Sequence, residues 1–347
     1  MSTKRNHEVT TSSRLLDHKG NIAEPGWSRK QLQYYDRADI KAPSYRIKEW
    51  DYYFVIGKDF GAAFTISDDG YIGLHSVSLL DFTKKKEHTE TILQPFPMGK
   101  LHLPCSSSEG ITEYHDKRLH MAFSLGKHSR RIRCSFKTFE DGKDFICDIT
   151  LQQPPMDSIV TAIPFKKGGA FYYNQKINCM RASGTITYDS RIYELHPETD
   201  FGSLDWGRGV WTYNNVWYWG SGSCDLDGKP FGFNIGYGFG DTSAATENVI
   251  FYDGKAHKLD DVIFHIPLTS SGAYDFMSPW TFSSSDGRFE MNFVPELDRA
   301  ARINAAIIET DQHQVFGILS GTTILDDGTP LSIQNMRCFA EWVHNRY

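Results

Sequence analysis

Six Asp-Gly pairs divide this chain into short runs of β-branched and aromatic residues. A type I′ turn needs positive φ at both central positions, so each pair favours a tight β-hairpin. A period of two, typical of a half-buried strand, is clear in residues 131–137. The segments between runs are too short for the crossover helices of a parallel sheet. We therefore predict an all-β antiparallel protein with turns at Asp69-Gly70, Asp141-Gly142, Asp227-Gly228, Asp253-Gly254, Asp286-Gly287 and Asp327-Gly328.

The chain is too long for a single small core. At 347 residues it exceeds the size at which one hydrophobic core usually stops growing. Strand-like runs continue on both sides of breaks near 164–169 and 183–184, which favours two β-barrel or β-sandwich halves over one sheet. The boundaries that we expect are a flexible N-terminal arm over 1–25, a first half over 26–182 and a second half over 183–347.

The C-terminal residues carry a helical pattern. Asn335 is a residue type that caps helices, and the apolar residues after it fall at i, i+3, i+4 and i+7. These are Met336, Phe339, Ala340 and Val343. The pattern predicts a short C-terminal helix that packs against a barrel or sheet.

Charge and cysteine spacing exclude several classes of protein. The net charge is −6 without a long basic run, so nucleic acid is not an expected partner. The six cysteines form no C-x-x-C pair, which argues against a zinc knuckle and favours buried thiols. No apolar signal segment and no run near the ~18 apolar residues of a membrane span is visible. We expect a cytoplasmic protein with no metal, no cofactor and no integral membrane segment.

Aromatic residues are concentrated in residues 205–223, where four of the eight tryptophans lie. Tryptophan and tyrosine supply large apolar area together with a polar group that needs a partner. The stretch is therefore either a polar-studded core or the wall of a pocket, and the glycines that interrupt it favour the pocket. The candidate ligand-binding residues here are Trp206, Trp211, Tyr213, Trp217 and Trp219.

The same stretch contains one carboxylate, Asp205, and one guanidinium, Arg208. A carboxylate in partly dry, aromatic surroundings has a raised pKa and suits a general acid, whereas a neighbouring arginine lowers that pKa. The alternative is a buried ion pair that fixes the turn between two barrels. Asp205 and Arg208 are therefore candidate catalytic residues, with a structural ion pair as the alternative.

Two further candidates lie outside this stretch. Glu247 follows the glycine-rich run 232–240, where small residues let a ligand or another backbone approach closely and where Asn234 and Tyr237 offer hydrogen bonds. It is either a pocket acid or a structural partner. His313 suits proton shuttling, although its surroundings in the sequence favour a satisfied structural histidine.

Several stretches together resemble a bacterial family known as domain of unknown function twenty-eight-oh-four. The likeness spans nearly the whole chain. The residues that carry it are Gly26–Arg29, Gly184–Tyr188, Phe201–Trp211, Thr246–Asn248, Asp311–Gly317 and His344–Tyr347.

The Asp205-Trp206-Gly207 element is more distantly similar to hydroxyneurosporene synthase, a carotenoid hydratase, and to AttH-like proteins. That resemblance implies paired lipocalin-like barrels. Those relatives tend to have a longer Asp-His-Glu-Trp-Gly run where this chain has Leu204 before Asp205. Any chemistry of the His-Glu pair is therefore absent from this position here.

The sequence leaves three functions open for an aromatic pocket at or beside the junction of the halves. The first is cofactor-free hydration, dehydration or double-bond isomerisation of a largely apolar or ring-containing molecule. In it Asp205 or Glu247 delivers the proton, Arg208 or His313 orients water or an oxygen, and the tryptophans stabilise a developing cation. The second is a non-catalytic lipid or isoprenoid carrier. The third is a carbohydrate-active enzyme that uses Asp205 and Glu247 as a carboxylate pair.

Overall fold

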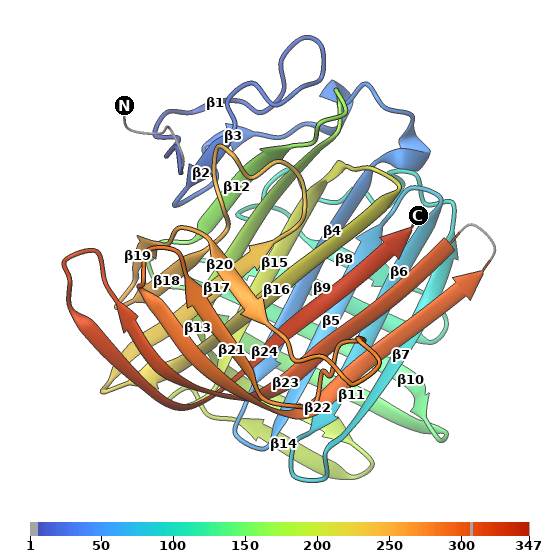
Figure 1. Cartoon of the computed structure of the whole chain (residues 1–347). Coiled ribbons are helices and arrows are strands. Elements are labelled where there is room, and N and C mark those ends of the chain that lie inside the picture. Colours follow the sequence, from blue (N-terminus) through green and yellow to red (C-terminus); the bar gives the residue numbers. More distant parts are fainter. Residues whose placement is uncertain (1–5, 306–307, 347) are drawn as a thin grey trace.

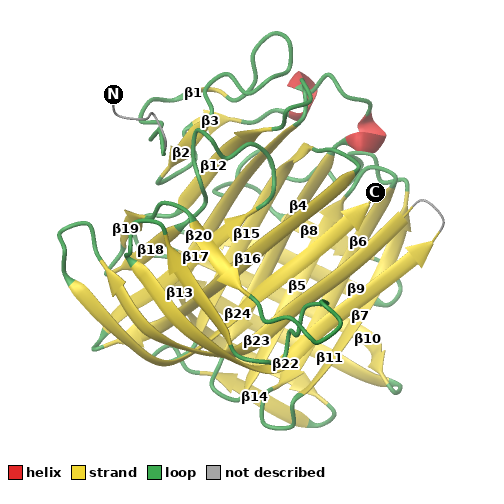
Figure 2. Cartoon of the chain, viewed as in Figure 1, coloured by secondary structure: helices red, strands yellow, loops and turns green. Residues whose placement is uncertain are grey.

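The computed structural model describes residues 6–305 and 308–346, and its regular structure is almost entirely β-strand (Figures 1 and 2). Two short 3-10 helices, η1 (Arg37–Asp39) and η2 (Ser44–Arg46), are its helical segments, and no α-helix occurs in the described ranges. Apart from a parallel pairing of β1 (Ser13–Arg14) with β3 (Gln33–Tyr34), the strands form two large antiparallel sheets. The predicted all-β antiparallel class is confirmed.

The first sheet has 13 strands and runs in the order β7-β6-β5-β4-β15-β13-β11-β10-β9-β8, with β2, β12 and β14 joined at the side. It curls around the larger hydrophobic core, and we call the sheet with this core the first half. Its strands are β2 (Gly26–Ser28), β4 (Lys48–Ile56), β5 (Phe60–Asp68), β6 (Ile72–Asp81), β7 (Lys86–Pro95), β8 (Thr112–His115), β9 (Leu119–Gly126), β10 (Ser129–Glu140), β11 (Lys143–Gln152), β12 (Ile159–Pro164), β13 (Phe171–Tyr188), β14 (Arg191–Leu195) and β15 (Phe201–Val210).

The second sheet has nine strands in the order β19-β18-β17-β16-β24-β23-β22-β21-β20 and curls around its own core. We call it the second half; Figure 1 shows it in yellow to red. Its strands are β16 (Asn214–Leu226), β17 (Lys229–Tyr237), β18 (Val249–Tyr252), β19 (Lys255–Lys258), β20 (Val262–His265), β21 (Trp280–Ser284), β22 (Phe289–Ala305), β23 (Ile308–Ile324) and β24 (Pro330–Arg346).

All six Asp-Gly pairs lie at turns between strands that are consecutive in the chain. In the pairs at 141–142, 227–228 and 253–254 both residues have positive φ, as a type I′ turn requires. In the other three pairs positive φ is confined to the glycine. The hairpins are therefore confirmed at all six places, and the type I′ geometry holds at three of them.

The predicted C-terminal helix is wrong, because residues 330–346 form β24, which pairs with β16 and β23 in the middle of the second sheet. Both faces of this strand are buried: Cys338 and Ala340 face the core of the second half, whereas Phe339 packs against the first half. A strand buried on both faces is apolar at most positions and so also matches helical spacing. Asn335, with φ of 54°, lies where the register with β23 shifts and caps no helix.

The predicted boundary between residues 182 and 183 falls within β13, and the first sheet takes in strands up to Val210. Residues 1–5 of the predicted arm lie outside the described residues. Of the remainder of that arm, Leu15 and Leu16 are buried in the first core. The division into domains and the flexibility of the arm stay predictions.

The two halves pack against each other through one face of each sheet. We call this contact the seam: the face of β4, β5, β6, β13 and β15 that meets β16, β17, β22, β23 and β24. Because side chains alternate along a strand, each of these strands has one face in its own core and the other in the seam. The apolar part of the seam comprises Tyr52, Phe54, Ile56, Ala63, Leu80 and Phe82 from the first half and Trp219, Leu297, Phe316 and Phe339 from the second.

Close packing against Trp50 explains why position 207 in the aromatic stretch is a glycine. Gly207 lies directly opposite Trp50 on the neighbouring strand, and a Cβ atom placed on it meets the Trp50 ring at 2.1 Å. That ring stacks on Tyr172 and contacts Trp211 edge to face. Gly207 therefore makes room for the aromatic packing at one end of the seam.

We expect Gly207→Ala to lower the free energy of unfolding by about 1–3 kcal/mol, because the added methyl group overpacks this site. Chemical denaturation measures the change. Gly168→Ala is the matched control, since its Cβ meets an oxygen of Asn21 at an ordinary 3.7 Å. Equal stability of the Gly207→Ala variant and the wild-type protein would contradict this account of the packing.

Candidate functional site

An ion pair between two neighbouring strands lies buried in the seam. Lys176 on β13 and Asp205 on β15 are cross-strand partners, and Lys176 Nζ lies 2.8 Å from Asp205 Oδ2. The Asn174 side chain donates a hydrogen bond of 2.6 Å to the other carboxylate oxygen. Lys176 is 4% and Asp205 8% exposed. A buried ammonium needs such partners, because desolvating an unpaired charge costs several kcal/mol.

The second half completes the surroundings of this lysine. Glu247 Oε2 lies 4.0 Å from Lys176 Nζ, and the Trp219 ring centre lies 3.9 Å from it, a cation–π distance. Asn234 links these two groups: its side-chain oxygen accepts from Trp219 Nε1 at 2.7 Å, and its amide donates to Glu247 Oε2 at 3.1 Å. One ammonium therefore joins carboxylates from the two halves.

A third carboxyl group, Glu341 on β24, lies in the same seam. It accepts hydrogen bonds from Trp217 Nε1 at 3.0 Å and from the Gln314 amide at 2.9 Å. Burial raises the pKa of the Glu341 carboxyl to about 7, although these hydrogen bonds and the nearby Arg299 and Lys176 charges oppose the shift. Burial also raises the pKa of Glu247. The seam thus contains an acid that is partly protonated at neutral pH.

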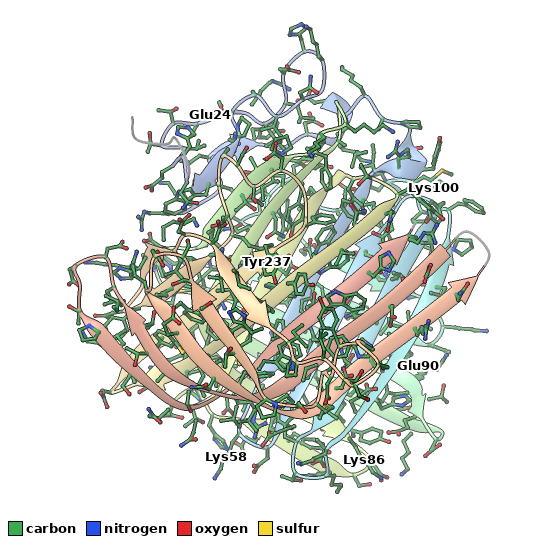
Figure 3. All side chains as sticks on the ribbon, viewed as in Figure 1. Glu24, Lys58, Lys86, Glu90, Lys100 and Tyr237 are labelled. Atoms are coloured by element: carbon green, nitrogen blue, oxygen red, sulfur yellow. The ribbon has the colours of Figure 1, made fainter. Side chains whose placement is uncertain are left out.

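Aromatic rings close one end of the seam. Phe239 is at the centre of this group, with ring-centre distances of 4.9 Å to Tyr172, 5.4 Å to Trp211 and 5.3 Å to Trp217. At the other end, a cavity of about 10 Å³ lies between Phe54, Phe201 and Phe339, which is space for about one water molecule. Side chains from both sheets fill much of the space between the ribbons (Figure 3).

The structure brings together six of the predicted site residues in or beside the seam. Asp205 and Glu247 share Lys176, while Trp219 and Asn234 join them. Trp217 donates a hydrogen bond to Glu341, and Trp211 belongs to the aromatic group around Phe239.

Arg208 and Trp206 point away from the seam, into the first half. Arg208 Nη2 lies 3.0 Å from Asp51 Oδ1, and the guanidinium lies 4.1 Å over the Trp206 ring. Side chains alternate between the two faces of a strand, so an odd position, 205, and an even one, 208, lie on opposite faces. Asp205 and Arg208 therefore form no ion pair with each other.

Three more predicted residues lie elsewhere. Tyr213 is half-exposed in the connection between the halves, with the Arg346 guanidinium 5.8 Å from its ring centre. Tyr237, labelled in Figure 3, stacks on Tyr218 at 4.4 Å on the inner face of the second sheet. His313 lies on that same inner face and forms a hydrogen bond with Asp298.

Sequence reasoning missed Lys176 and Glu341, the charged groups around which the seam is arranged. A signal for Lys176 exists: in 172–178 the polar residues Asn174, Lys176 and Asn178 share one parity of the strand, whereas the other parity holds a single polar residue, Gln175. For Glu341 the signal is a single carboxylate in the apolar run 338–343. Both patterns point to a polar feature between two apolar layers.

The described ranges contain no group of three or more histidine, cysteine, aspartate or glutamate side chains that is suited to a metal ion. In the same ranges no helix has the length and apolar character needed to cross a membrane.

One of two similar solved structures supports this architecture. A putative AttH from Nitrosomonas europaea superposes with a TM-score of 0.54 at 12% identity, over 90% of this chain and 98% of that one. Kievitone hydratase from Nectria haematococca gives a TM-score of 0.48 at 10% identity, over 96% and 98% of the two chains. The search of curated proteins finds no match. The fold is that of a lipocalin-like protein made of two half-barrels.

The family is defined by sequence. The sequence model of the domain of unknown function DUF2804 matches residues 6–347, so this chain belongs to that family. The family resemblance inferred from the sequence motifs is confirmed.

The raised pKa of Glu341 predicts a pH dependence of stability. The folded protein retains the Glu341 proton up to about pH 7, whereas an ordinary glutamate loses it near 4.5. This group therefore contributes most to stability at low pH, and its contribution falls as the pH rises between those two values. We expect wild-type protein to lose about 2 kcal/mol more than Glu341→Gln between roughly pH 5 and pH 8.

Denaturation at several pH values measures this difference, and pH effects of other groups are common to both proteins and cancel. Glu113→Gln, at an exposed position of β8, is the matched control and retains the wild-type slope. Parallel profiles for wild type and Glu341→Gln would mean that Glu341 ionises normally in the folded protein.

Proposed function

We propose that the seam binds a small, largely apolar, ring-containing molecule and moves protons to and from it without a redox cofactor. The reactions that such chemistry serves are addition of water to a carbon–carbon double bond, its elimination, and migration of the double bond. The observation that carries the proposal is the burial of the Glu341 carboxyl, with Trp217 and Gln314 as donors, on the same seam as the Asp205–Lys176 ion pair. This burial raises the pKa of Glu341 to about 7. A general acid works best when its pKa is close to the working pH.

In this scheme Glu341 gives its proton to one alkene carbon, and positive charge develops on the other. The ring face of Trp217 stabilises that charge, whereas Trp219 already holds the Lys176 ammonium. Water then adds to the cationic carbon and loses a proton to the Asp205 carboxylate, which Lys176 and Asn174 hold in place. Dehydration is the reverse, and isomerisation removes a proton from a neighbouring carbon instead of adding water.

The connection 238–248 between β17 and β18 is the proposed entrance. It carries Phe239, the central ring of the aromatic end, and Glu247, the second carboxylate on Lys176. Gly238 and Gly240, with φ of 95° and 81°, flank Phe239. Movement of this connection displaces the Phe239 ring and exposes the polar groups behind it, as closing loops do in many enzymes.

The carbohydrate-active alternative has less support. Glycoside hydrolysis needs two carboxyl groups on either side of the scissile bond. Lys176 Nζ contacts both Asp205 and Glu247, so its side chain occupies the space between them. A non-catalytic carrier uses the same aromatic walls without proton transfer, and the experiment below separates it from an enzyme.

The test begins with protein purified from its own host and native mass spectrometry, which identifies a bound small molecule. Incubation of that molecule with protein in deuterated water then reports proton transfer, because reversible protonation of a double bond introduces deuterium at carbon. We expect Glu341→Gln to retain the ligand and to lower the rate of deuterium incorporation by roughly 100-fold. Trp219→Ala should lose ligand, since it removes a wall of the site.

Glu113→Gln, far from the seam in the sheet order, is the control and should exchange at the wild-type rate. A retained ligand that gains no deuterium with wild-type protein would identify a carrier. Exchange that survives Glu341→Gln unchanged would remove Glu341 as the acid.

A further inference from the structure

A histidine–aspartate pair lies on the opposite face of β23 from the seam. His313 Nδ1 is 2.6 Å from Asp298 Oδ2 on β22. Because a carboxylate accepts, this bond places the proton of the neutral imidazole on Nδ1 and leaves a lone pair on Nε2. The contact of Nε2 with Asp311 Oδ1 is 3.6 Å, too long for a hydrogen bond. The ring is therefore oriented with an acceptor nitrogen on its other edge.

Aromatic side chains enclose this imidazole. Phe276 stacks on it with ring centres 3.9 Å apart and an interplanar angle of 16°, and Trp342 lies 6.4 Å away. Tyr274 contacts both Phe276 and Trp342. Phe276 and Tyr274 belong to the connection 266–279 between β20 and β21, which Figure 2 shows in green in front of the second sheet.

Solvent reaches this cluster, unlike the seam. The His313 side chain is 24% exposed, and Tyr274 is also partly exposed, with its hydroxyl 2.7 Å from that of Tyr218. Asp298 Oδ1 is buried without a hydrogen-bond partner, which leaves polar capacity unused beside the histidine. Stacking surfaces, an oriented acceptor and access from solvent are elements that small-molecule sites use.

The charges around His313 restrict what it can bind. Asp298 and Asp311 place two carboxylates on either side of the imidazole. They disfavour an anionic ligand such as an aromatic acid, because like charges repel at these distances. A neutral ligand that donates a hydrogen bond meets the Nε2 lone pair without that cost.

We propose that this cluster is a second ligand site, separate from the seam, for a neutral aromatic ring that bears a hydroxyl group. The ring packs against the side chains of Phe276, Tyr274 and Trp342, and the hydroxyl donates to His313 Nε2. Asp298 acts as a positioning residue, since it fixes the tautomer that makes Nε2 an acceptor. The ligand class is that of the phenols.

The experiment uses phenol and benzoate as probes for titration calorimetry on the full-length protein. Phenol should bind wild-type protein, and benzoate should bind at least tenfold more weakly because of the two carboxylates. His313→Phe retains a ring to stack on Phe276 and removes the acceptor nitrogen, so phenol affinity should fall about tenfold, as expected for one hydrogen bond. The resonance of His313 Nε2 should shift on addition of phenol.

Two substitutions of Asp298 separate positioning from packing. Asp298→Asn retains an oxygen that accepts from Nδ1–H and should bind phenol nearly as well as wild type. Asp298→Ala removes the acceptor that fixes the His313 tautomer and should bind phenol more weakly. His265→Phe is the matched control, because His265 is exposed on β20 and shares a hydrogen bond with Ser283 outside the cluster. It should leave phenol affinity unchanged.

Three results would overturn the proposal: benzoate binding as tightly as phenol, full phenol affinity in a folded His313→Phe protein, or no phenol binding to wild type. Phenol binding that is lost in Trp219→Ala but retained in His313→Phe would assign the probe to the seam. None of these results bears on proton transfer at Glu341.

Discussion

The burial of one ammonium group, that of Lys176, is the constraint on which the seam depends. An unpaired charge there would destabilise the fold by about 3–5 kcal/mol. The Asp205 carboxylate on β15, the Glu247 carboxylate from the connection after β17 and the face of Trp219 on β16 together compensate it. Since these partners come from both halves, compensation of this one charge requires the observed register of β13 and β15 and the close approach of β16 from the other sheet.

The period of two along a strand decides what the Asp-Trp-Gly-Arg stretch does. Asp205 faces the seam, whereas Trp206 and Arg208 face the first half, where Arg208 meets Asp51 and Glu49. Gly207 returns to the seam side and makes room for Trp50. A stretch that reads as one cluster in the sequence therefore contributes to two separate polar environments.

Local signals predicted the hairpins, because an Asp-Gly turn is determined by the residues that form it. The C-terminal strand and the seam depend on pairings that no local pattern contains. Strand β24 pairs with β16 across more than a hundred residues and is buried on both faces, so its apolar spacing matched a helix. Lys176 meets Asp205 only in a register that shifts between Ile177 and Met180, and Glu341 acquires its raised pKa only once both sheets cover it. The local sequence marks Lys176 and Glu341 as polar residues on apolar strands, but it identifies neither the partners of Lys176 nor the raised pKa of Glu341.

Two half-barrels packed face to face give each strand at the seam two faces with different polar groups. On β23, Gln314 holds Glu341 in the seam while His313, the residue before it, faces the inside of the second half. On β24, Glu341 and Trp342 divide in the same way. The two proposed sites are thus separated by the thickness of one sheet, and both stand on strands that are paired on both sides. Such strands are the rigid part of an antiparallel sheet, and each proposed site is completed by a connection: 238–248 at the seam and 266–279 at His313.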